Sequence, residues 1–336
     1  MTGIPAAPGA PVAARRSLAA ATRAGRRRSR HNADRAFRLL VTATSTAVLL
    51  LVAAMAAFLV YRAIPALQAN TGHFFTDQVW LPDDAAPRFG IAAALYFTIL
   101  TSAIAMVLAV PVALTTALFV TFYALRRLGN ALGYLVELLA AVPSIVYGLW
   151  GFAFLAPHLT GLVQWLDRWF GWTGLLSYRP DNQPNSYSPL AAGIVLAIMI
   201  LPTIASISRE VLRRVPDDQV EAALALGASR AEMLRMAVLP VSRPGVIAAS
   251  LLGLSRALGE TLAVTLVLST MFTISFHITE SGGVTLAAVI ALKYGEAGQV
   301  GTGALIAVGL CLFVLTLAVN TAASVIIGRR REGRSA

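Results

Sequence analysis

Six long runs of apolar residues, separated by shorter polar segments, dominate this chain. The runs lie near Leu39–Tyr61, Ile91–Phe122, Ala131–Ala156, Leu190–Ser208, Val246–Met271 and Ala304–Ile327. A helix needs about 20 apolar residues to cross the hydrocarbon core of a bilayer, and each run has about that length or more. The pattern therefore predicts an all-α, polytopic membrane protein with six transmembrane helices.

The composition favours a membrane protein over a soluble one. The 336 residues are 57% hydrophobic and 13% charged, whereas about a quarter of the residues in an average soluble protein are charged. A net charge of +11 would also fit a nucleic-acid-binding protein, but the basic residues flank the apolar runs. We therefore interpret the charge as a signal of membrane topology and expect no nucleic-acid partner.

Basic residues are distributed unevenly between the two sides of the predicted membrane domain. Nine arginines lie in the first 38 residues, two between the second and third runs, six between the fourth and fifth, and four after the sixth. The alternate loops hold only Arg62, Arg88, Arg168, Arg179 and Lys293. Because the more basic loops stay on the cytoplasmic side, both termini are predicted to be cytoplasmic.

The polar ends of the chain define the predicted domain organisation. Residues 1–36 are rich in Ala, Pro and Arg and are predicted to form a disordered basic cytoplasmic tail. Residues 37–328 form the six-helix transmembrane domain, and residues 329–336 form a second cytoplasmic tail.

One external loop, residues 158–188, has an aromatic pattern of its own. Trp165, Trp169 and Trp172 recur at helical spacing, which predicts a short helix lying in the membrane interface. The alternative is a docking surface for a substrate-binding protein, to which Asp181 would contribute.

The segment 209–243, between the fourth and fifth runs, has the pattern of two short helices. Gly227 separates the two predicted helices, and Pro240 is predicted to end the second. Two residue pairs have the spacing of a capping box, namely Asp218 with Glu221 and Ser229 with Glu232. We therefore expect a folded loop that presents a surface, either to the rest of the chain or to a partner.

The same segment contains an ordered motif. It reads Glu221-Ala222-Ala223, three residues, Gly227, nine residues, then Ala237-Val238-Leu239-Pro240. This order resembles the EAA loop of bacterial ABC importer permeases, although Ala237 stands where that family has isoleucine. In that family the loop docks into a groove on the ATP-binding subunit. The resemblance implies that Glu221, Ala222, Gly227 and Pro240 couple this chain to ATPase subunits, which bind ATP-Mg, and that this chain itself binds no cofactor.

Further segments are similar to the phosphate importer permeases, which are binding-protein-dependent permeases of the MetI-like family. These segments are Val142–Gly148, Leu201–Ser208 and Arg256–Thr261, while Phe89-Gly90-Ile91 and Gly295-Glu296-Ala297 favour a PstC-type subunit. The resemblance implies a MetI-like ABC importer permease fold in the bacterial inner (plasma) membrane. It also implies as partners a homologous PstA-type permease, two PstB-type ATP-binding subunits and an extracytoplasmic PstS-type phosphate-binding protein.

Two charged residues, Arg256 and Glu260, interrupt the fifth apolar run. They lie four residues apart and would share one face of a continuous helix. Because a charge at the bilayer centre costs about 2.5–3.5 kcal/mol on insertion scales, we expect neither side chain to face lipid. The pair either neutralises itself and fixes helix packing, or it faces a polar path for the substrate. We favour the path, because an arginine fork matches two phosphate oxygens; the resemblance likewise implies a transport role for both residues.

Hydroxyl residues on neighbouring runs are candidates for the same path, although each is also a common helix-packing residue. They are Ser255, Thr261, Ser144, Thr203 and Ser206. Glu260 is further predicted to accept a hydrogen bond from a phosphate hydroxyl, which fully ionised sulfate lacks.

The sequence shows no catalytic or metal-binding pattern. A P-loop ends in Gly-Lys followed by Ser or Thr, but the only lysine, Lys293, follows Leu292. The four histidines have no metal-ligand spacing. We therefore expect a non-hydrolysing transport subunit rather than an enzyme. A permease for another oxyanion such as sulfate or molybdate, a secondary transporter that works alone, and a membrane sensor remain as alternatives.

Overall fold

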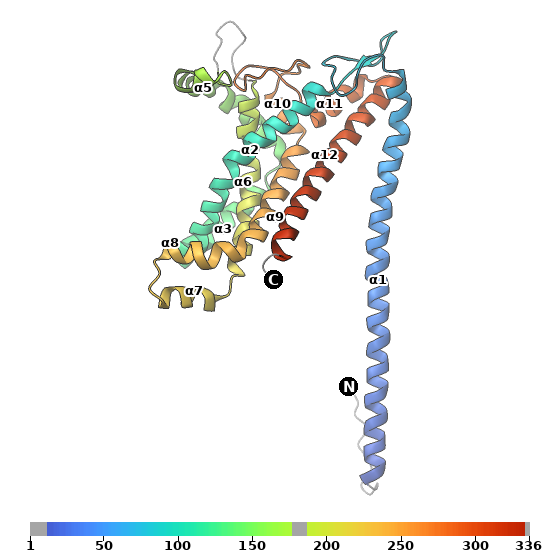
Figure 1. Ribbon diagram of the computed structural model, residues 1–336, viewed down its shortest axis with the longest axis vertical. Coiled ribbons are helices and arrows are strands. Elements are labelled where there is room, and N and C mark those ends of the chain that lie inside the picture. Colours follow the sequence, from blue (N-terminus) through green and yellow to red (C-terminus); the bar gives the residue numbers. More distant parts are fainter. Residues whose placement is uncertain (1–11, 177–186, 333–336) are drawn as a thin grey trace. The chain divides into compact units, whose positions relative to one another are not determined.

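The computed structural model describes residues 12–176 and 187–332 (Figure 1), with side chains described for all of these except 12–34, 36, 126 and 326–332. The chain divides into two units, Met1–Phe58 and Leu59–Ala336. All the functional residues discussed below lie in the second unit.

Helices dominate the described residues. In chain order they are α1 (Val12–Ala69), α2 (Ala92–Leu118), α3 (Arg126–Ala140), α4 (Ser144–Trp150), α5 (Ala156–Phe170), α6 (Pro189–Arg213), α7 (Asp217–Ala225), α8 (Arg230–Met233), α9 (Leu239–Leu258), α10 (Leu262–Val267), α11 (Leu286–Lys293) and α12 (Gln299–Glu332). Short π-helical turns lie at η1 (Phe119–Tyr123), η2 (Gly151–Leu155) and η4 (Leu234–Val238), and 3-10 turns at η3 (Gly171–Thr173) and η5 (Tyr294–Glu296). Two short antiparallel strands, β1 (Trp80–Leu81) and β2 (Arg88–Phe89), pair Trp80 with Phe89.

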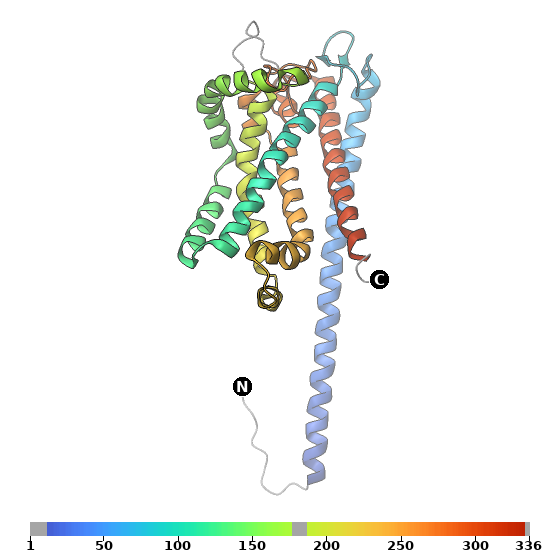
Figure 2. The same cartoon turned by 60° about the vertical axis from the view of Figure 1, so that its left-hand side comes forward.

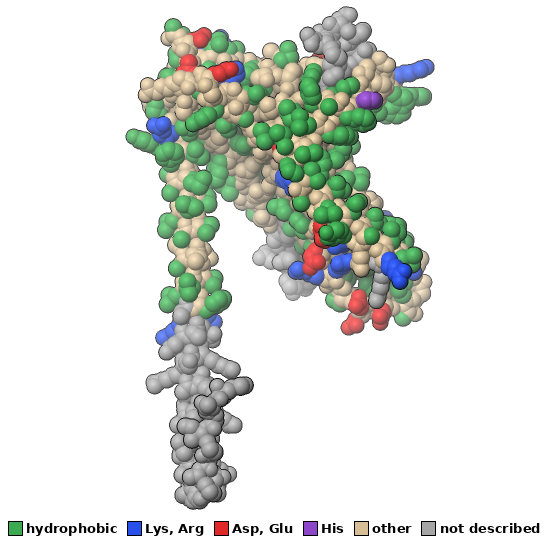
Figure 3. Space-filling view, turned by 180° about the vertical axis from the view of Figure 1, so that it is seen from behind, with side chains coloured by type: hydrophobic (Ala, Val, Ile, Leu, Met, Phe, Trp, Pro, Cys, Tyr) green, Lys and Arg blue, Asp and Glu red, His purple; other side chains and the backbone are tan. Residues whose placement is uncertain are grey.

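The prediction of six membrane spans is confirmed. Within the described residues, six helical segments are long and apolar enough to cross a bilayer: Phe37–Ala69, Ala92–Tyr123, Ser144–Thr173, Pro189–Arg213, Arg230–Leu258 and Gln299–Val325. Hydrophobic side chains cover the middle of the second unit, and charged side chains gather near the end that carries α7 and α8 (Figure 3).

The third span departs from the predicted window Ala131–Ala156. The helix stops at Ala140 and restarts at Ser144, because Pro143 lacks a backbone N–H and takes an extended conformation (ψ 138°). The hydroxyl of Tyr147 donates a hydrogen bond to the Leu139 carbonyl across this break at 2.8 Å. A hydropathy window does not detect such a break, because the residues on both sides remain apolar.

The N-terminal region differs from the disordered tail expected for residues 1–36. The helix α1 begins at Val12, so the backbone of residues 12–36 is helical, and residues 1–11 lie outside the described residues. Alanine and arginine both have high helix propensity, which favours extension of the first span backwards into this segment. From Phe37 to Phe58 almost every side chain of α1 is exposed, as suits a helix surrounded by lipid.

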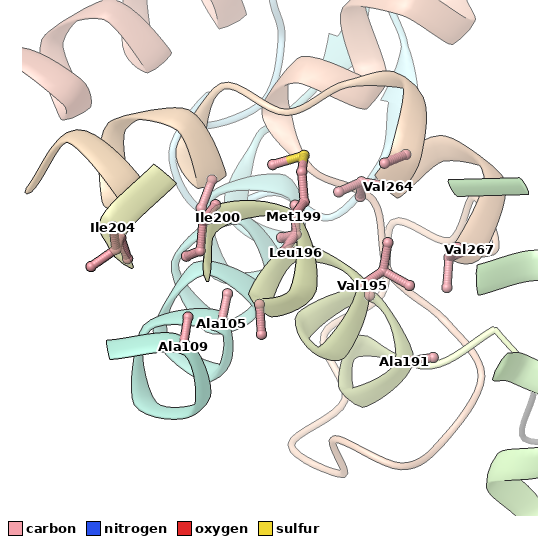
Figure 4. Packing of buried hydrophobic residues seen from close by; sticks show 14 of the residues in the cluster. Ala105, Ala109, Ala191, Val195, Leu196, Met199, Ile200, Ile204, Val264 and Val267 are labelled. Carbon is pink, nitrogen blue, oxygen red and sulfur yellow. The ribbon is translucent and has the colours of Figure 1, made fainter. Parts of the chain in front are cut away.

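The core of the second unit is built around α6. Its face packs against α2 and α10, with Leu196, Met199 and Ile200 almost fully buried. Figure 4 shows Ala105 and Ala109 of α2 next to this face. Small side chains let the two helices approach closely, as is usual between membrane helices.

The helix α5 has the two faces expected of an interfacial helix. Leu159 and Val163 are buried against the rest of the unit, whereas Trp165 and Trp169 of α5 and Trp172 of the following turn η3 are exposed. Figure 2 shows α5 lying crosswise to α2 and α6 at the end opposite to α7. Asp181, which the alternative docking surface would include, lies outside the described residues.

The fifth span begins earlier than the predicted window Val246–Met271. The elements α8, η4 and α9 form one helical segment from Arg230 to Leu258. The prediction that Pro240 ends a helix is therefore wrong, since Pro240 lies in the first turn of α9. The π-helical turn η4 precedes it, with Leu239 N bonded to the Leu234 carbonyl, and this altered pattern accommodates a residue that cannot donate.

Candidate functional site

The fifth span is broken at the charged residues of the predicted path. The helix α9 ends at Leu258, residues 259–261 are not helical, and α10 begins at Leu262. Arg256 therefore lies in the last turn of one helix, and Glu260 lies before the start of the next. The prediction that both share one face of a continuous helix is wrong, because spacing alone does not reveal the break.

Arg256 is held by a residue of another span. Its Nη1 donates a hydrogen bond to Thr203 Oγ1 of α6 at 3.1 Å, and both side chains are half-buried. Among the described residues, no carboxylate forms an ion pair with Arg256. Some buried side-chain atoms of the described residues lack a hydrogen-bond partner, but none of them belongs to Arg256. The guanidinium is therefore fixed in direction but keeps donors available for another acceptor.

Glu260 has a structural partner of its own. One carboxylate oxygen, Oε1, accepts a hydrogen bond from the backbone N–H of Ala263 at 3.1 Å. This bond satisfies a donor that the first turn of a helix leaves without an intrahelical partner. Glu260 therefore stabilises the restart of the span at α10, and it does not neutralise Arg256 directly.

A neighbouring contact joins α9 to the last span. Ser255 Oγ lies 2.8 Å from Asn320 Oδ1 of α12 and 3.0 Å from the Leu251 carbonyl. Sequence reasoning missed Asn320, although an amide side chain inside an apolar run was a visible signal. Because Ser255 contacts α12 and Arg256 contacts α6, the two residues face different neighbours.

The other hydroxyl candidates have separate surroundings. Thr261 Oγ1 bonds the Gly259 carbonyl at 3.3 Å, within the break itself. Ser144 and Ser206 are half-buried, and no hydrogen bond of either hydroxyl is seen among the described residues. Of the predicted path residues, the structure thus joins Arg256 to Thr203 and places Glu260 and Thr261 at the adjoining break.

The predicted loop 209–243 folds as two helices around a glycine turn. The helix α7 starts at Asp217, with Pro216 as its N-cap and no side-chain cap. The predicted capping box of Asp218 with Glu221 is therefore wrong, because Asp218 already lies inside the first turn. The second box is confirmed, since Ser229 and Glu232 exchange both hydrogen bonds at the start of α8.

Gly227 makes the turn between the two helices. Its φ is +86°, and a Cβ at this position would meet nothing within 4 Å. A side chain here would therefore be disfavoured by backbone strain and not by a clash.

The apolar residues of this loop divide between two surfaces. Val220 packs with Met233, Leu234 and Val238 against the end of α6. Leu226 is 90% exposed and Met236 63% exposed, and both border a hollow of about 550 Å³. The other lining residues are Ala222, Ala223, Gly227, Ala228, Glu232 and Ala237. We call this hollow and its lining the coupling surface, after the contact that the resemblance implies for this loop; Glu221 and Pro240 are not part of the lining.

An ion pair at the end of α6 was not recognised from the sequence. Arg209 Nη2 of α6 donates to Glu137 Oε1 of α3 at 2.7 Å. The Arg209 side chain is only 14% exposed, and it lies over Gly133, where a Cβ would overlap the guanidinium. The pair ties α3 to the end of α6 that leads into α7.

These features define a multi-pass membrane protein with polar groups gathered at a break inside the bundle. Residues 109–332 match the family model described as "Binding-protein-dependent transport system inner membrane component". The chain therefore belongs to this family of inner-membrane components of binding-protein-dependent transport systems.

Individual relatives agree with the family match. The "Phosphate transport system permease protein PstC 2" of Mycobacterium bovis is 45% identical over 302 residues, covering 89% of this chain and 93% of the relative. The "Phosphate transport system permease protein PstC" of Xylella fastidiosa is 38% identical over 304 residues, covering 90% and 93%. An inward-facing structure of the MetNI methionine ABC transporter is 20% identical, covers 71% of this chain and 93% of its own, and has a TM-score of 0.48.

The ion pair of Glu137 with Arg209 generates a stability prediction. We expect Glu137→Gln to lower the free energy of unfolding by roughly 1–2 kcal/mol, because it leaves a buried guanidinium without counter-charge, although the half-exposed carboxylate moderates the loss. Thermal unfolding of the purified protein in detergent measures this. The matched control is Glu210→Gln, since Glu210 pairs with Arg214 at the surface with 60% and 76% of the side chains exposed. Equal losses in both variants would contradict the prediction.

Proposed function

We propose that this chain is the permease subunit of an ATP-driven ABC importer and forms part of the transmembrane path for inorganic phosphate. Family membership supports the transport role, and the names of the relatives support the substrate. The observation that carries the proposal is Arg256, a cation in a candidate membrane span that, among the described residues, is held by Thr203 and not by a carboxylate.

The chemistry of the guanidinium suits a phosphate oxyanion. Arginine offers several N–H donors in a planar fork, which match two oxygens of one anion. The hydrogen bond that Arg256 donates to Thr203 uses one of these donors and orients the guanidinium. Because Thr203 is neutral, it holds Arg256 in place without competing electrostatically with the arriving anion. An acidic partner bound directly to Arg256 would have to be displaced at each transport step.

Glu260 supplies the second element of the proposed selectivity. One of its oxygens caps α10, so the carboxylate is held beside the break instead of being free to swing. We propose that this carboxylate accepts a hydrogen bond from a phosphate hydroxyl, which fully ionised sulfate lacks. Ser255, Thr261, Ser144 and Ser206 are proposed as further polar groups of the path.

The coupling surface is the proposed contact with the ATPase subunits. Exposed Leu226 and Met236 beside a hollow lined by small residues offer an apolar socket for a side chain of a partner. Ala222 and Gly227 line the hollow, whereas Glu221 and Pro240 would act at its margin. ATP-Mg would be bound by two PstB-type subunits, and the energy of its hydrolysis would reach this chain through the socket.

The remaining partners follow from the family and the charge distribution. A PstA-type permease would complete the path, and an extracytoplasmic PstS-type protein would deliver phosphate. We propose that the α7 end and both termini are cytoplasmic, since the loops predicted to lie at that end are the arginine-rich ones.

The first functional prediction concerns Arg256 and Glu260, and it distinguishes the effect of losing a charge from the effect of disturbing the fold at the break. Arg256→Gln is expected to lower phosphate uptake by roughly 10- to 100-fold, the loss expected for a charge-assisted contact of about 1.5–3 kcal/mol. Glu260→Gln is expected to retain the cap on Ala263, because its amide oxygen still accepts, while discrimination between phosphate and sulfate falls. Uptake of labelled phosphate and sulfate into vesicles holding the complete transporter measures both effects.

The control for this test is Glu260→Ala, which removes both the cap and the charge and should also lower the melting temperature. Unchanged uptake by Arg256→Gln would refute the path. Uptake of sulfate in preference to phosphate by the unmodified protein would assign the path to another oxyanion.

The second functional prediction concerns coupling. Gly227→Val is expected to reduce co-purification of the ATPase subunits, because a β-branched residue is strongly disfavoured at a φ of +86° and the turn must rearrange. Gly295→Val is the matched control, since a Cβ at Gly295 also meets nothing within 4 Å but that glycine has no positive φ. Full recovery of the ATPase subunits with Gly227→Val would count against the coupling surface.

A further inference from the structure

Two helix breaks, one between α3 and α4 and the other between α9 and α10, each have one side chain that bonds a backbone group. In a continuous helix the Leu139 carbonyl would accept from the N–H four residues on, but that residue is Pro143, which has no N–H. The carbonyl accepts instead from the Tyr147 hydroxyl at 2.8 Å and from the Val142 N–H at 3.2 Å. Tyr147 thus serves the first break as Glu260, which accepts from a backbone N–H, serves the second.

The helices that follow the two breaks pack directly against each other. Gly148 of α4 is buried, and a Cβ on it would lie 2.7 Å from the Cα of Ala263 and 3.2 Å from its carbonyl oxygen. The N–H of Ala263 is the one that donates to Glu260. The side chain of Tyr147 packs on the buried cluster that contains Ala257 and Ala263. Because Gly148 meets backbone and not a flexible side chain, a shift of α4 would displace the start of α10.

Arg256 lies near the same contact. Its positive charge acts on the Tyr147 hydroxyl, and its Nη1 donates to Thr203. Tyr147 and Thr203 thus approach the guanidinium from two different helices, α4 and α6. The break between α3 and α4 is therefore close to the residues of the proposed path.

We propose that Tyr147 is a positioning residue of the phosphate path, whose hydroxyl bond to Leu139 keeps α4 in the place where it supports Glu260 and the start of α10. This inference rests on the proposed function, since it concerns the selectivity of the same path.

The physical connection runs through the two observed contacts. Without the hydroxyl, the Leu139 carbonyl loses a donor that Pro143 cannot replace. The helix α4 is then held less firmly to α3, and Gly148 passes its displacement to the backbone that Glu260 caps. A carboxylate held less firmly distinguishes less well between phosphate, which carries a hydroxyl, and fully ionised sulfate, which does not.

The test measures uptake of labelled phosphate and labelled sulfate into vesicles that contain the complete transporter. Tyr147→Phe removes the hydroxyl and keeps the ring. The preference for phosphate over sulfate should fall roughly 2- to 10-fold, the factor that corresponds to one neutral hydrogen bond. Tyr134→Phe is the matched control and should leave the preference unchanged. Tyr134 of α3 is 64% exposed, and no hydrogen bond of its hydroxyl is seen among the described residues.

Two further variants test the connection itself. Gly148→Ala should lower the same preference, because its methyl group forces α4 away from the backbone of Ala263. Gly161→Ala of α5 is its control, since a Cβ there meets nothing within 4 Å. When Tyr147→Phe is combined with Glu260→Gln, it should cause little further loss of preference, because both changes act on one carboxylate.

Three outcomes would overturn the proposal. One is an unchanged preference in Tyr147→Phe. Another is an equal fall in the uptake of both anions with a lower melting temperature, which would give the hydroxyl a purely structural role. The third is full additivity of Tyr147→Phe and Glu260→Gln. The proposed function fails separately, since it requires Arg256→Gln to lower phosphate uptake whatever Tyr147→Phe does.

Discussion

The absence of hydrogen-bonding solvent in the bilayer is the constraint on which the rest of this structure depends. Every polar group in a span needs a partner from the protein or a route to water. The interruption of the fifth span at residues 259–261 frees backbone groups, and it places the charge of Glu260 at the break and that of Arg256 in the helical turn before it. Thr203 meets the guanidinium of Arg256, and Glu260 meets the freed N–H of Ala263. Both charged residues are thus tied to protein without being paired with each other.

The fifth span and α6 connect this break with the opposite end of the unit. From Arg230 to Leu258 the fifth span is one helical segment, with the coupling surface at its start and Arg256 in its last turn. The helix α6 carries Thr203 beside Arg256 and Arg209 beside Glu137, before it leads into α7. A displacement of the coupling surface would therefore reach the guanidinium through continuous helix and a directly bonded neighbour, which is the physical connection that the proposed coupling to ATP hydrolysis requires.

The sequence predicted the features that depend on long patterns, and missed those that depend on backbone geometry or distant contacts. The length of the apolar runs predicted six spans, and the spacing of Ser229 and Glu232 predicted a capping box that the structure contains. The break at Glu260 was not predicted, because the four-residue spacing of Arg256 and Glu260 is the same whether or not the helix continues. Asp218 was wrongly taken as a cap because Pro216 starts α7 earlier. The partners Asn320 and Glu137 required tertiary structure, since each lies more than 60 residues from the residue that it contacts.

The central claim is that the surroundings of Arg256 become wetted and receive an anion. The most direct measurement is the reaction of Thr203→Cys, in a Cys311→Ser background, with an anionic methanethiosulfonate reagent in the complete transporter, with and without nucleotide. The account predicts modification in at least one nucleotide state and protection by phosphate, while a cysteine at lipid-exposed Val48 stays unmodified. A thiol at position 203 that is unreactive in every state, with uptake intact, would contradict the account.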